Sequence, residues 1–225
     1  MTQEITAMAE DYLKAVYSAS EWGGGGISIS GLAARMNVVA STASENVKKL
    51  VDAGLLVHVP YQKVTLTPQG QEKALRIVRI HRLLETYLYQ RLNYDWDEVH
   101  DEAEQLEHVV SDRLINHMDK DLGYPTHDPH GDPIPQPDGT VPSQKWLPLA
   151  QLPPGAAARV LRISDKEAEL LRHLESLGVV PNAMITMVGH QQYAGTYQIA
   201  MNNVTFDLGE RAVESIWIAA PQESS

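Results

Sequence analysis

The feature that most constrains this chain is a group of four imidazole and carboxylate side chains at helical spacing. They are His100, Glu104, Glu107 and His108, at positions i, i+4, i+7 and i+8. Residues so spaced share one face of an α-helix, so the pattern predicts four potential metal ligands along one stripe. Apolar residues form the opposite stripe and predict one helix over about residues 99–118 that borders a core. They are Val99, Ala103, Leu106, Val110 and Leu114.

A second pair of potential ligands, His81 and Glu85, has i, i+4 spacing on a long helix expected over about residues 68–92. Two antiparallel helices could bring all six side chains into one or two metal sites. The chain has no cysteine, so every ligand must be nitrogen or oxygen. Oxygen-rich sets favour manganese or iron(II) over copper, although affinity order alone favours zinc or copper. The alternative is that these residues form ordinary surface pairs.

The amino-terminal pattern predicts three helices and a hairpin. Apolar residues at helical spacing over residues 4–20 predict the first helix. Ser30 is the expected N-cap of a short second helix, and Thr42 and Glu45 fit a capping box at the start of the third. Two short β-prone runs then meet near Tyr61. This order predicts a winged helix-turn-helix.

The third helix is the expected DNA-reading element, because the second helix of a helix-turn-helix unit enters the major groove. A small helical domain with a solvated polar face is the alternative. The side chains expected near the bases are Ser41, Thr42, Ser44, Glu45 and Asn46, and those expected at phosphates are Lys48, Lys49 and Lys63.

Net charge argues against DNA binding until its distribution is considered. The chain carries −11 overall. Residues 1–75 hold six Lys or Arg and seven Asp or Glu, whereas residues 76–122 and 123–225 each hold six against eleven. The acidic excess therefore lies outside the expected DNA-binding head.

The carboxyl-terminal third predicts a separate module. Residues 123–145, rich in proline, glycine, aspartate and histidine, predict an ordered turn-rich stretch that passes into a linker. Short β-prone runs around one helix over residues 149–219 predict a small β-barrel. The predicted fold class is thus mainly α with a small β-barrel, in domains 1–75, 76–143 and 147–220. No apolar run approaches the ~20 residues that span a bilayer, so we expect a soluble cytoplasmic protein without membrane contact.

Several segments resemble the diphtheria toxin repressor and manganese transport regulator family. They are AEDYLKAVY near the amino terminus, RIHRLLETYL at 79–88, VHDEAEQLEHVVSD at 99–112 and DPHGDPIP at 128–135. The resemblance covers about residues 8–137 with consistent spacing. It implies a manganese-dependent repressor of metal homeostasis genes that binds double-stranded operator DNA as a homodimer, and no enzyme. The carboxyl-terminal module is similar to the family's SH3-like, or FeoA-like, domain.

The resemblance also implies two metal sites. The first would comprise Asp11, Glu104, Glu107 and His108, and the second His81, Glu85 and His100. Iron-type members have methionine and cysteine where Asp11 and Glu104 stand, so acids here favour Mn²⁺, with Fe²⁺ as the alternative. Some manganese members have glutamate where Lys14 stands, which leaves the number of ions open. Glu167 or Glu169 is a further ligand candidate.

Two other classes of protein stay open. A hydrolytic metalloenzyme could hold the same ligands, but the chain has no HExxH pattern or nucleophile elbow. A scaffold with a peptide-binding carboxyl-terminal module is the other alternative.

Overall fold

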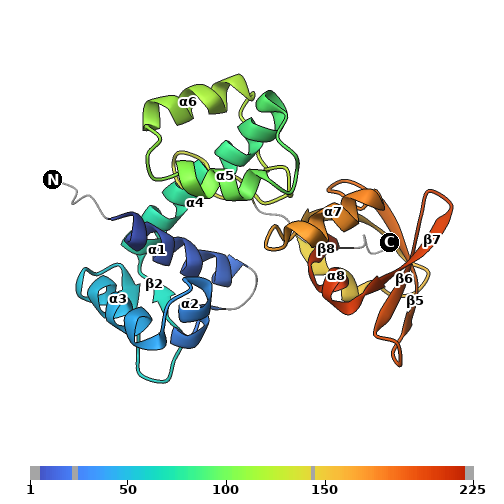
Figure 1. Ribbon diagram of the computed structural model, residues 1–225, viewed down its shortest axis with the longest axis horizontal. Helices are drawn as coiled ribbons and strands as arrows, with labels where there is room; N and C mark the ends of the chain where they lie inside the picture. Colours follow the sequence, from blue (N-terminus) through green and yellow to red (C-terminus); the bar gives the residue numbers. More distant parts are fainter. Residues whose placement is uncertain (1–5, 22–24, 143–144, 221–225) are drawn as a thin grey trace. The chain divides into compact units, whose positions relative to one another are not determined.

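The computed structural model describes residues 6–21, 25–142 and 145–220, which fall into two compact units (Figure 1). Of the described residues, the first unit consists of 6–21, 25–81, 107–110 and 135–141, and the second of 82–106, 111–134, 142 and 145–220. Among the described residues, no helix is both long and apolar enough to cross a membrane.

The amino-terminal elements have the order of a winged helix-turn-helix, as the sequence predicts. They are α1 (Ala7–Ala19), α2 (Ile29–Arg35), α3 (Ala40–Asp52), β1 (Leu56–Val57) and β2 (Thr65–Leu66). The two strands pair antiparallel. Leu13, Leu32 and Val47, one from each helix, are buried in a shared apolar core. Residues 4 and 5 of the expected first helix lie outside the described residues.

The starts of two helices differ from the predicted ones. Ser28, not Ser30, caps α2, because its hydroxyl accepts a 3.1 Å hydrogen bond from a first-turn amide. Helix α3 has Val39 as its N-cap and no side-chain cap bond. The expected capping box of Thr42 and Glu45 is therefore wrong, since a capping residue must precede the helix and both lie inside it.

The helical segment contains one break that the sequence analysis missed. Its helices are α4 (Pro68–Leu92), α5 (Val99–Leu106) and α6 (Asp112–Asp121). The single helix expected over residues 99–118 is wrong, because the chain turns after Leu106 and restarts with Ser111 as the N-cap of α6. Leu114, expected on the core side, is 47% exposed. Glu107 and His108 consequently lie in a turn, not on a continuous helical stripe.

Substitution of Ser111 tests how much its capping hydrogen bond stabilises the start of α6. Its hydroxyl accepts a hydrogen bond from the Leu114 amide at 3.3 Å, which satisfies one free N–H of the first turn. We expect Ser111→Ala to lower the free energy of unfolding by about 1 kcal/mol. Ser111→Asp should retain most of it, since aspartate also caps. Denaturant unfolding of both variants provides the measurement, and equal losses would contradict the capping role.

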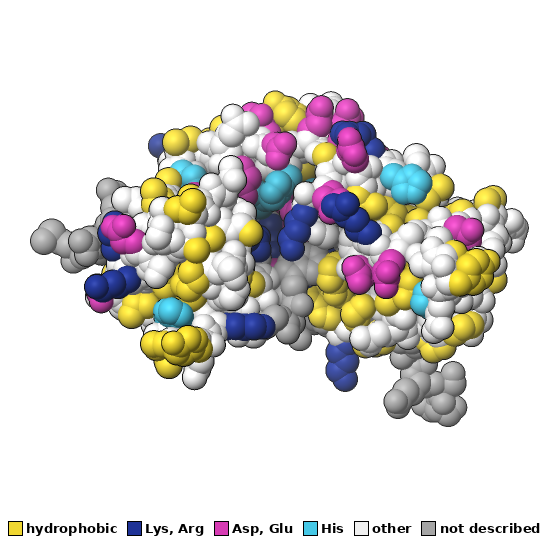
Figure 2. Space-filling view, turned by 60° about the horizontal axis from the view of Figure 1, so that its bottom comes forward, with side chains coloured by type: hydrophobic (Ala, Val, Ile, Leu, Met, Phe, Trp, Pro, Cys, Tyr) yellow, Lys and Arg dark blue, Asp and Glu magenta, His cyan; other side chains and the backbone are white. Residues whose placement is uncertain are grey.

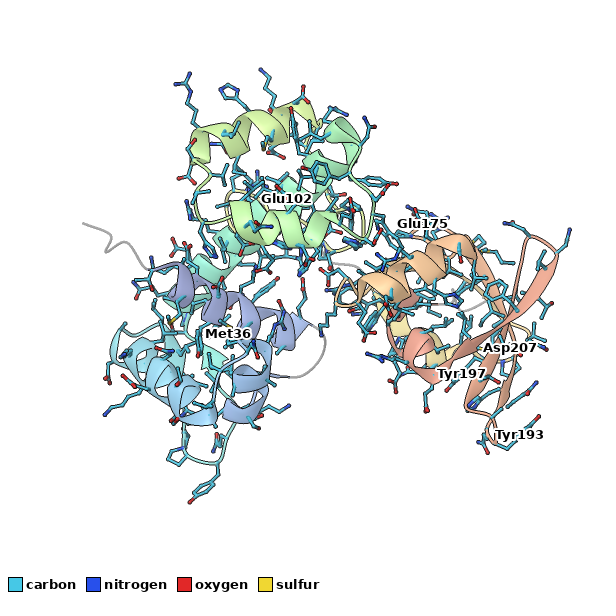
Figure 3. All side chains as sticks on the ribbon, viewed as in Figure 1. Met36, Glu102, Glu175, Tyr193, Tyr197 and Asp207 are labelled. Carbon is cyan, nitrogen blue, oxygen red and sulfur yellow. The ribbon has the colours of Figure 1, made fainter. Side chains whose placement is uncertain are left out.

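The carboxyl-terminal module is a six-stranded antiparallel sheet with the order β3-β8-β4-β5-β6-β7. Its elements are β3 (Trp146–Pro148), the short 3-10 helix η2 (Leu149–Gln151), β4 (Ala157–Ile163), α7 (Ala168–Ser176), β5 (Met184–Gln191), β6 (Thr196–Met201), β7 (Val204–Gly209), α8 (Glu210–Glu214) and β8 (Ile216–Ala219). Figure 3 labels Tyr193 at the tip of the β5–β6 hairpin.

The expected closed barrel is wrong. In the described part of the chain β3 and β7 are the two edges of the sheet and do not pair with each other. Strand β3 is only three residues long and ends at Pro148, which has no backbone N–H to donate. The sheet is therefore open.

The core of this sheet includes one residue from the helical segment. Trp96, from the connection between α4 and α5, is 4% exposed and belongs to the same apolar cluster as the strands. Its indole N–H donates to the Pro129 carbonyl at 3.2 Å, and its ring stacks on His130 at 5.3 Å. Within the second unit, Trp96 thus joins the α4–α5 connection to the core of the sheet.

Candidate metal centre

Asp11, Glu107 and His108 form a first cluster of potential metal ligands, inside the first unit. Asp11 lies on α1, and the other two lie in the turn after α5. One ligand atom from each lies within 4.8 Å of the others. His108 Nε2 is 2.8 Å from Asp11 Oδ1 and 3.5 Å from Glu107 Oε1. Two carboxylates and an imidazole are a donor set suited to a divalent metal ion.

Three further side chains contact this first cluster. Glu10 Oε2 is 2.8 Å from His108 Nδ1. Glu107, whose side chain is fully buried, contacts Lys14 Nζ through Oε1 and His81 Nδ1 through Oε2, each at 2.5 Å. His81 therefore lies against a first-site candidate. Glu10 was not predicted from the sequence, where its signal is its position next to Asp11.

The pKa values of the first cluster reflect burial and opposite charge. Burial raises the pKa of Asp11, and the nearby His108 only partly opposes this. Burial would also raise the pKa of Glu107, but its hydrogen bond to His81 and the charge of Lys14 outweigh burial and lower it. Burial disfavours charged His108, yet Glu10 and Asp11 raise its pKa. The carboxylates of the cluster are thus stabilised by the positive charges of Lys14 and the histidines, and a bound cation could supply the same positive charge.

Glu85, His100 and Asp165 form a second cluster, inside the second unit. His100 Nδ1 is 3.2 Å from Glu85 Oε1 and 3.1 Å from Asp165 Oδ2. Its Nε2 is 3.7 Å from Glu104 Oε1. Burial disfavours charged His100, but hydrogen bonds to Asp165 and Glu85 outweigh burial and raise its pKa to about 11. The 3.7 Å distance places Glu104, which was predicted for the first site, beside His100 of the second cluster.

Asp165 is a candidate that sequence reasoning missed. The candidates named in this segment were Glu167 and Glu169, in the first turn of α7 or just before it. Glu167 Oε1 instead pairs with Arg211 Nη2 at 2.6 Å. Asp165 follows the end of β4, and no spacing within the sequence indicates that this strand end meets His100.

A third group shares Glu85 with the second cluster. Glu85, Asp128 and His130 are all buried and offer ligand atoms within 4.8 Å of one another. Burial raises the pKa of Asp128 well above its usual range, and the negative charges of Asp132 and Glu85 add to this. His130 Nε2 is 3.0 Å from the Trp96 carbonyl, whereas its Nδ1 has no hydrogen-bond partner among the described residues. This nitrogen and these carboxylates could also hold a cation.

The polar face of α3 is exposed, as a DNA-reading helix requires. The exposed residues of the predicted set are Ser41, Thr42, Ser44, Glu45, Lys48, Lys49 and, in the wing, Lys63. Glu45 Oε1 pairs with Lys49 Nζ at 2.8 Å. Asn46 is half-buried and donates to the Tyr12 hydroxyl at 3.3 Å. Figure 2 shows lysine and arginine side chains dispersed among acidic ones on the face in view.

Family models match most of the chain. They are the iron dependent repressor N-terminal DNA binding domain over residues 4–64, the iron dependent repressor metal binding and dimerisation domain over 67–136, and the FeoA domain over 147–220. Together with the winged head and the carboxylate–imidazole clusters, they define a metal-dependent, DNA-binding transcriptional repressor and not an enzyme.

Individual relatives support the same class. The iron-dependent repressor IdeR of Mycobacterium leprae is 31% identical over 197 residues, which is 82% of this chain and 85% of that protein. The diphtheria toxin repressor of Corynebacterium diphtheriae is 29% identical over 171 residues, 72% of this chain and 75% of that protein. A solved structure described as a manganese-dependent transcriptional repressor complex with manganese is 45% identical, covers 94% of this chain and 99% of that chain, and has a TM-score of 0.90. The chain belongs to the diphtheria toxin repressor and iron-dependent repressor family.

Proposed function

We propose that this chain is a manganese-dependent repressor that binds operator DNA as a homodimer and controls genes of metal homeostasis. Residues 1–75 form the DNA-binding head, 76–143 the dimerisation and metal-binding domain, and 147–220 the SH3-like domain. The observation that carries the proposal is the 2.8 Å approach of Asp11, on a helix of the head, to His108, in the turn after α5.

Two metal sites are part of the proposal. The first is held by Asp11, Glu107 and His108, and the second by Glu85, His100 and Asp165, because each group offers ligand atoms within 4.8 Å. From the family resemblance, Glu104 is proposed as a further ligand of the first site and His81 of the second. A divalent ion supplies two positive charges at each site. Asp128 and His130 are alternative partners of Glu85.

The donor set supports manganese. Every candidate ligand is a carboxylate or an imidazole, and hard oxygen donors suit manganese and iron(II). The relative of 45% identity is described as manganese-dependent, whereas the 31% identical relative from Mycobacterium leprae is named iron-dependent. Iron(II) is therefore the second candidate, favoured by the names of the curated relatives.

Coupling between metal and DNA follows from the position of Asp11 on α1. The Asp11 carboxylate lies 2.8 Å from His108 Nε2. Joint ligation of one cation by Asp11 and His108 would restrain α1, and with it the head, more firmly. In a dimer this restraint sets the spacing of two recognition helices for successive major grooves. Neutralised carboxylates also repel phosphates less.

Exposed apolar side chains in the second unit support a homodimer. Leu92 of α4 and Leu114 of α6 are 54% and 47% exposed, and Tyr89 and Tyr124 are 43% and 63% exposed. A contiguous exposed apolar patch often marks an association surface, and these residues lie in the segment that matches the metal binding and dimerisation family model. Burial of these four residues between two copies of the chain would explain why they are apolar.

Duplex binding across a metal series tests the proposal. Purified protein should bind operator duplex tightly with manganese, and weakly after metal removal by a chelator. Iron(II), cobalt and zinc serve as comparisons, and elemental analysis of the dimer gives the number of ions bound. A response to iron(II) alone would favour the second candidate. No duplex binding with any metal, together with a captured protein partner, would contradict a repressor.

A further inference from the structure

The second metal cluster depends on where one strand ends. Glu85 lies on α4 and His100 on α5, but Asp165 comes from the carboxyl-terminal sheet, two residues after β4. Its carboxylate reaches within 3.1 Å of His100 Nδ1. A small displacement of β4 would therefore remove Asp165 from the cluster without changing Glu85 or His100. Something must hold the end of β4 in place.

Arg162, three residues before Asp165 on β4, is suited to this task. Its side chain has 0% relative exposure and forms an ion pair with Asp132. The guanidinium also lies over the ring of Trp146 at 4.5 Å, and 6.0 Å from that of Trp217. A fully buried arginine is costly unless it is paired and well oriented. Asp132, in the loop, supplies the opposite charge, and the two indole rings of the sheet lie against the guanidinium.

The loop that receives Arg162 is itself rigidly built. The Asp128 Oδ1 atom accepts hydrogen bonds from the backbone N–H groups of His130 and Asp132, each at 2.9 Å. Arg82 Nη2 of α4 lies 3.8 Å from Asp132 Oδ1. The Ile163 backbone N–H donates to the His130 carbonyl at 2.9 Å. Strand β4 is thus joined to this loop by an ion pair and a backbone hydrogen bond, and the loop in turn lies 3.8 Å from Arg82 of α4.

We propose that Arg162 is a positioning residue for the second metal site: through its ion pair with Asp132 it holds the end of β4 so that Asp165 reaches His100. The inference rests on the second site proposed above. Arg162 itself does not touch the cation.

Manganese titration of full-length variants tests this role. The titrations use a His108→Ala background, in which only the second site should bind tightly. We expect Arg162→Met to weaken manganese binding roughly 10- to 100-fold, the range for residues that orient metal ligands. Arg162→Lys keeps the charge and should restore part of the loss. Arg159→Met is the matched control, because Arg159 lies on the same strand with its side chain exposed, and it should leave binding unchanged.

Further variants separate the possible outcomes. The manganese affinity of the first site, measured in Asp165→Asn protein, should be unaffected by Arg162→Met. A general loss of stability would instead weaken both sites. If Arg162→Met lacks a cooperative unfolding transition, Arg162→Lys and Asp132→Asn carry the same comparison. If Arg162→Met and Arg159→Met bind manganese with equal affinity while Asp165→Asn binds it more weakly, the role of Arg162 is overturned and the second site stands. No loss in Asp165→Asn would overturn the second site, and the role of Arg162 with it.

Discussion

His108→Ala is expected to abolish the manganese-dependent gain in DNA affinity. His108 contacts Asp11 of α1 through one ring nitrogen and Glu10 through the other, both at 2.8 Å. Coupling between two ligands of a regulatory protein is typically about 5- to 150-fold. Without the imidazole, the affinities measured with and without manganese should become equal.

The change should act on the switch and leave the fold intact. His108 lies in a turn and is half-buried, so alanine removes a polar contact and creates no large cavity. Duplex titrations with and without manganese provide the measurement, with size-exclusion chromatography to verify the dimer. His117→Ala is the control, because His117 is exposed on α6. A His108→Ala protein that retained the manganese response of the unmodified chain would contradict the first site.

Much of the fold could be predicted from sequence because helices and turns are encoded by local periodicity. The winged head and the long helix α4 follow from apolar spacing of this kind. The break before α6 was missed because Val109 and Val110 continue the apolar pattern, although Ser111 followed by Asp112 is a helix-start signal. Periodicity records which residues are apolar. It does not record whether the backbone turns between them.

The candidate metal site could be predicted only where its members share local spacing or a family motif. His100 and Glu104 are one helical turn apart and lie together. Asp165 joins His100 across 65 positions of sequence, and only the packing of the sheet against the helical segment creates that contact. His130 is a second example, because it lies in a loop and only the fold brings it near Glu85 of α4. Long-range contacts of this kind have no periodic signature in a single sequence.

Gly131→Ala should separate the carboxyl-terminal sheet from the metal-binding loop. A Cβ atom at residue 131 would lie 1.9 Å from the Leu161 carbonyl oxygen, and the backbone φ of +88° already disfavours any L side chain. Because the obstacle is backbone and not a flexible side chain, the loop or β4 must move. Strain and overpacking together predict a loss of about 3 kcal/mol or more in the free energy of unfolding.

A second glycine distinguishes the clash from the strain. Gly155 has a similar φ of +82°, but nothing lies within 4 Å of a Cβ there, so Gly155→Ala should cost only the ~1–2 kcal/mol of a left-handed residue. The excess loss in Gly131→Ala then measures how closely the loop approaches β4. Because that approach also places Asp165, Gly131→Ala should weaken second-site manganese binding whereas Gly155→Ala should not. Equal unfolding losses in the two variants would show that the loop can move away from β4 at little cost, and the carboxyl-terminal module would then not be rigidly joined to the metal-binding helices.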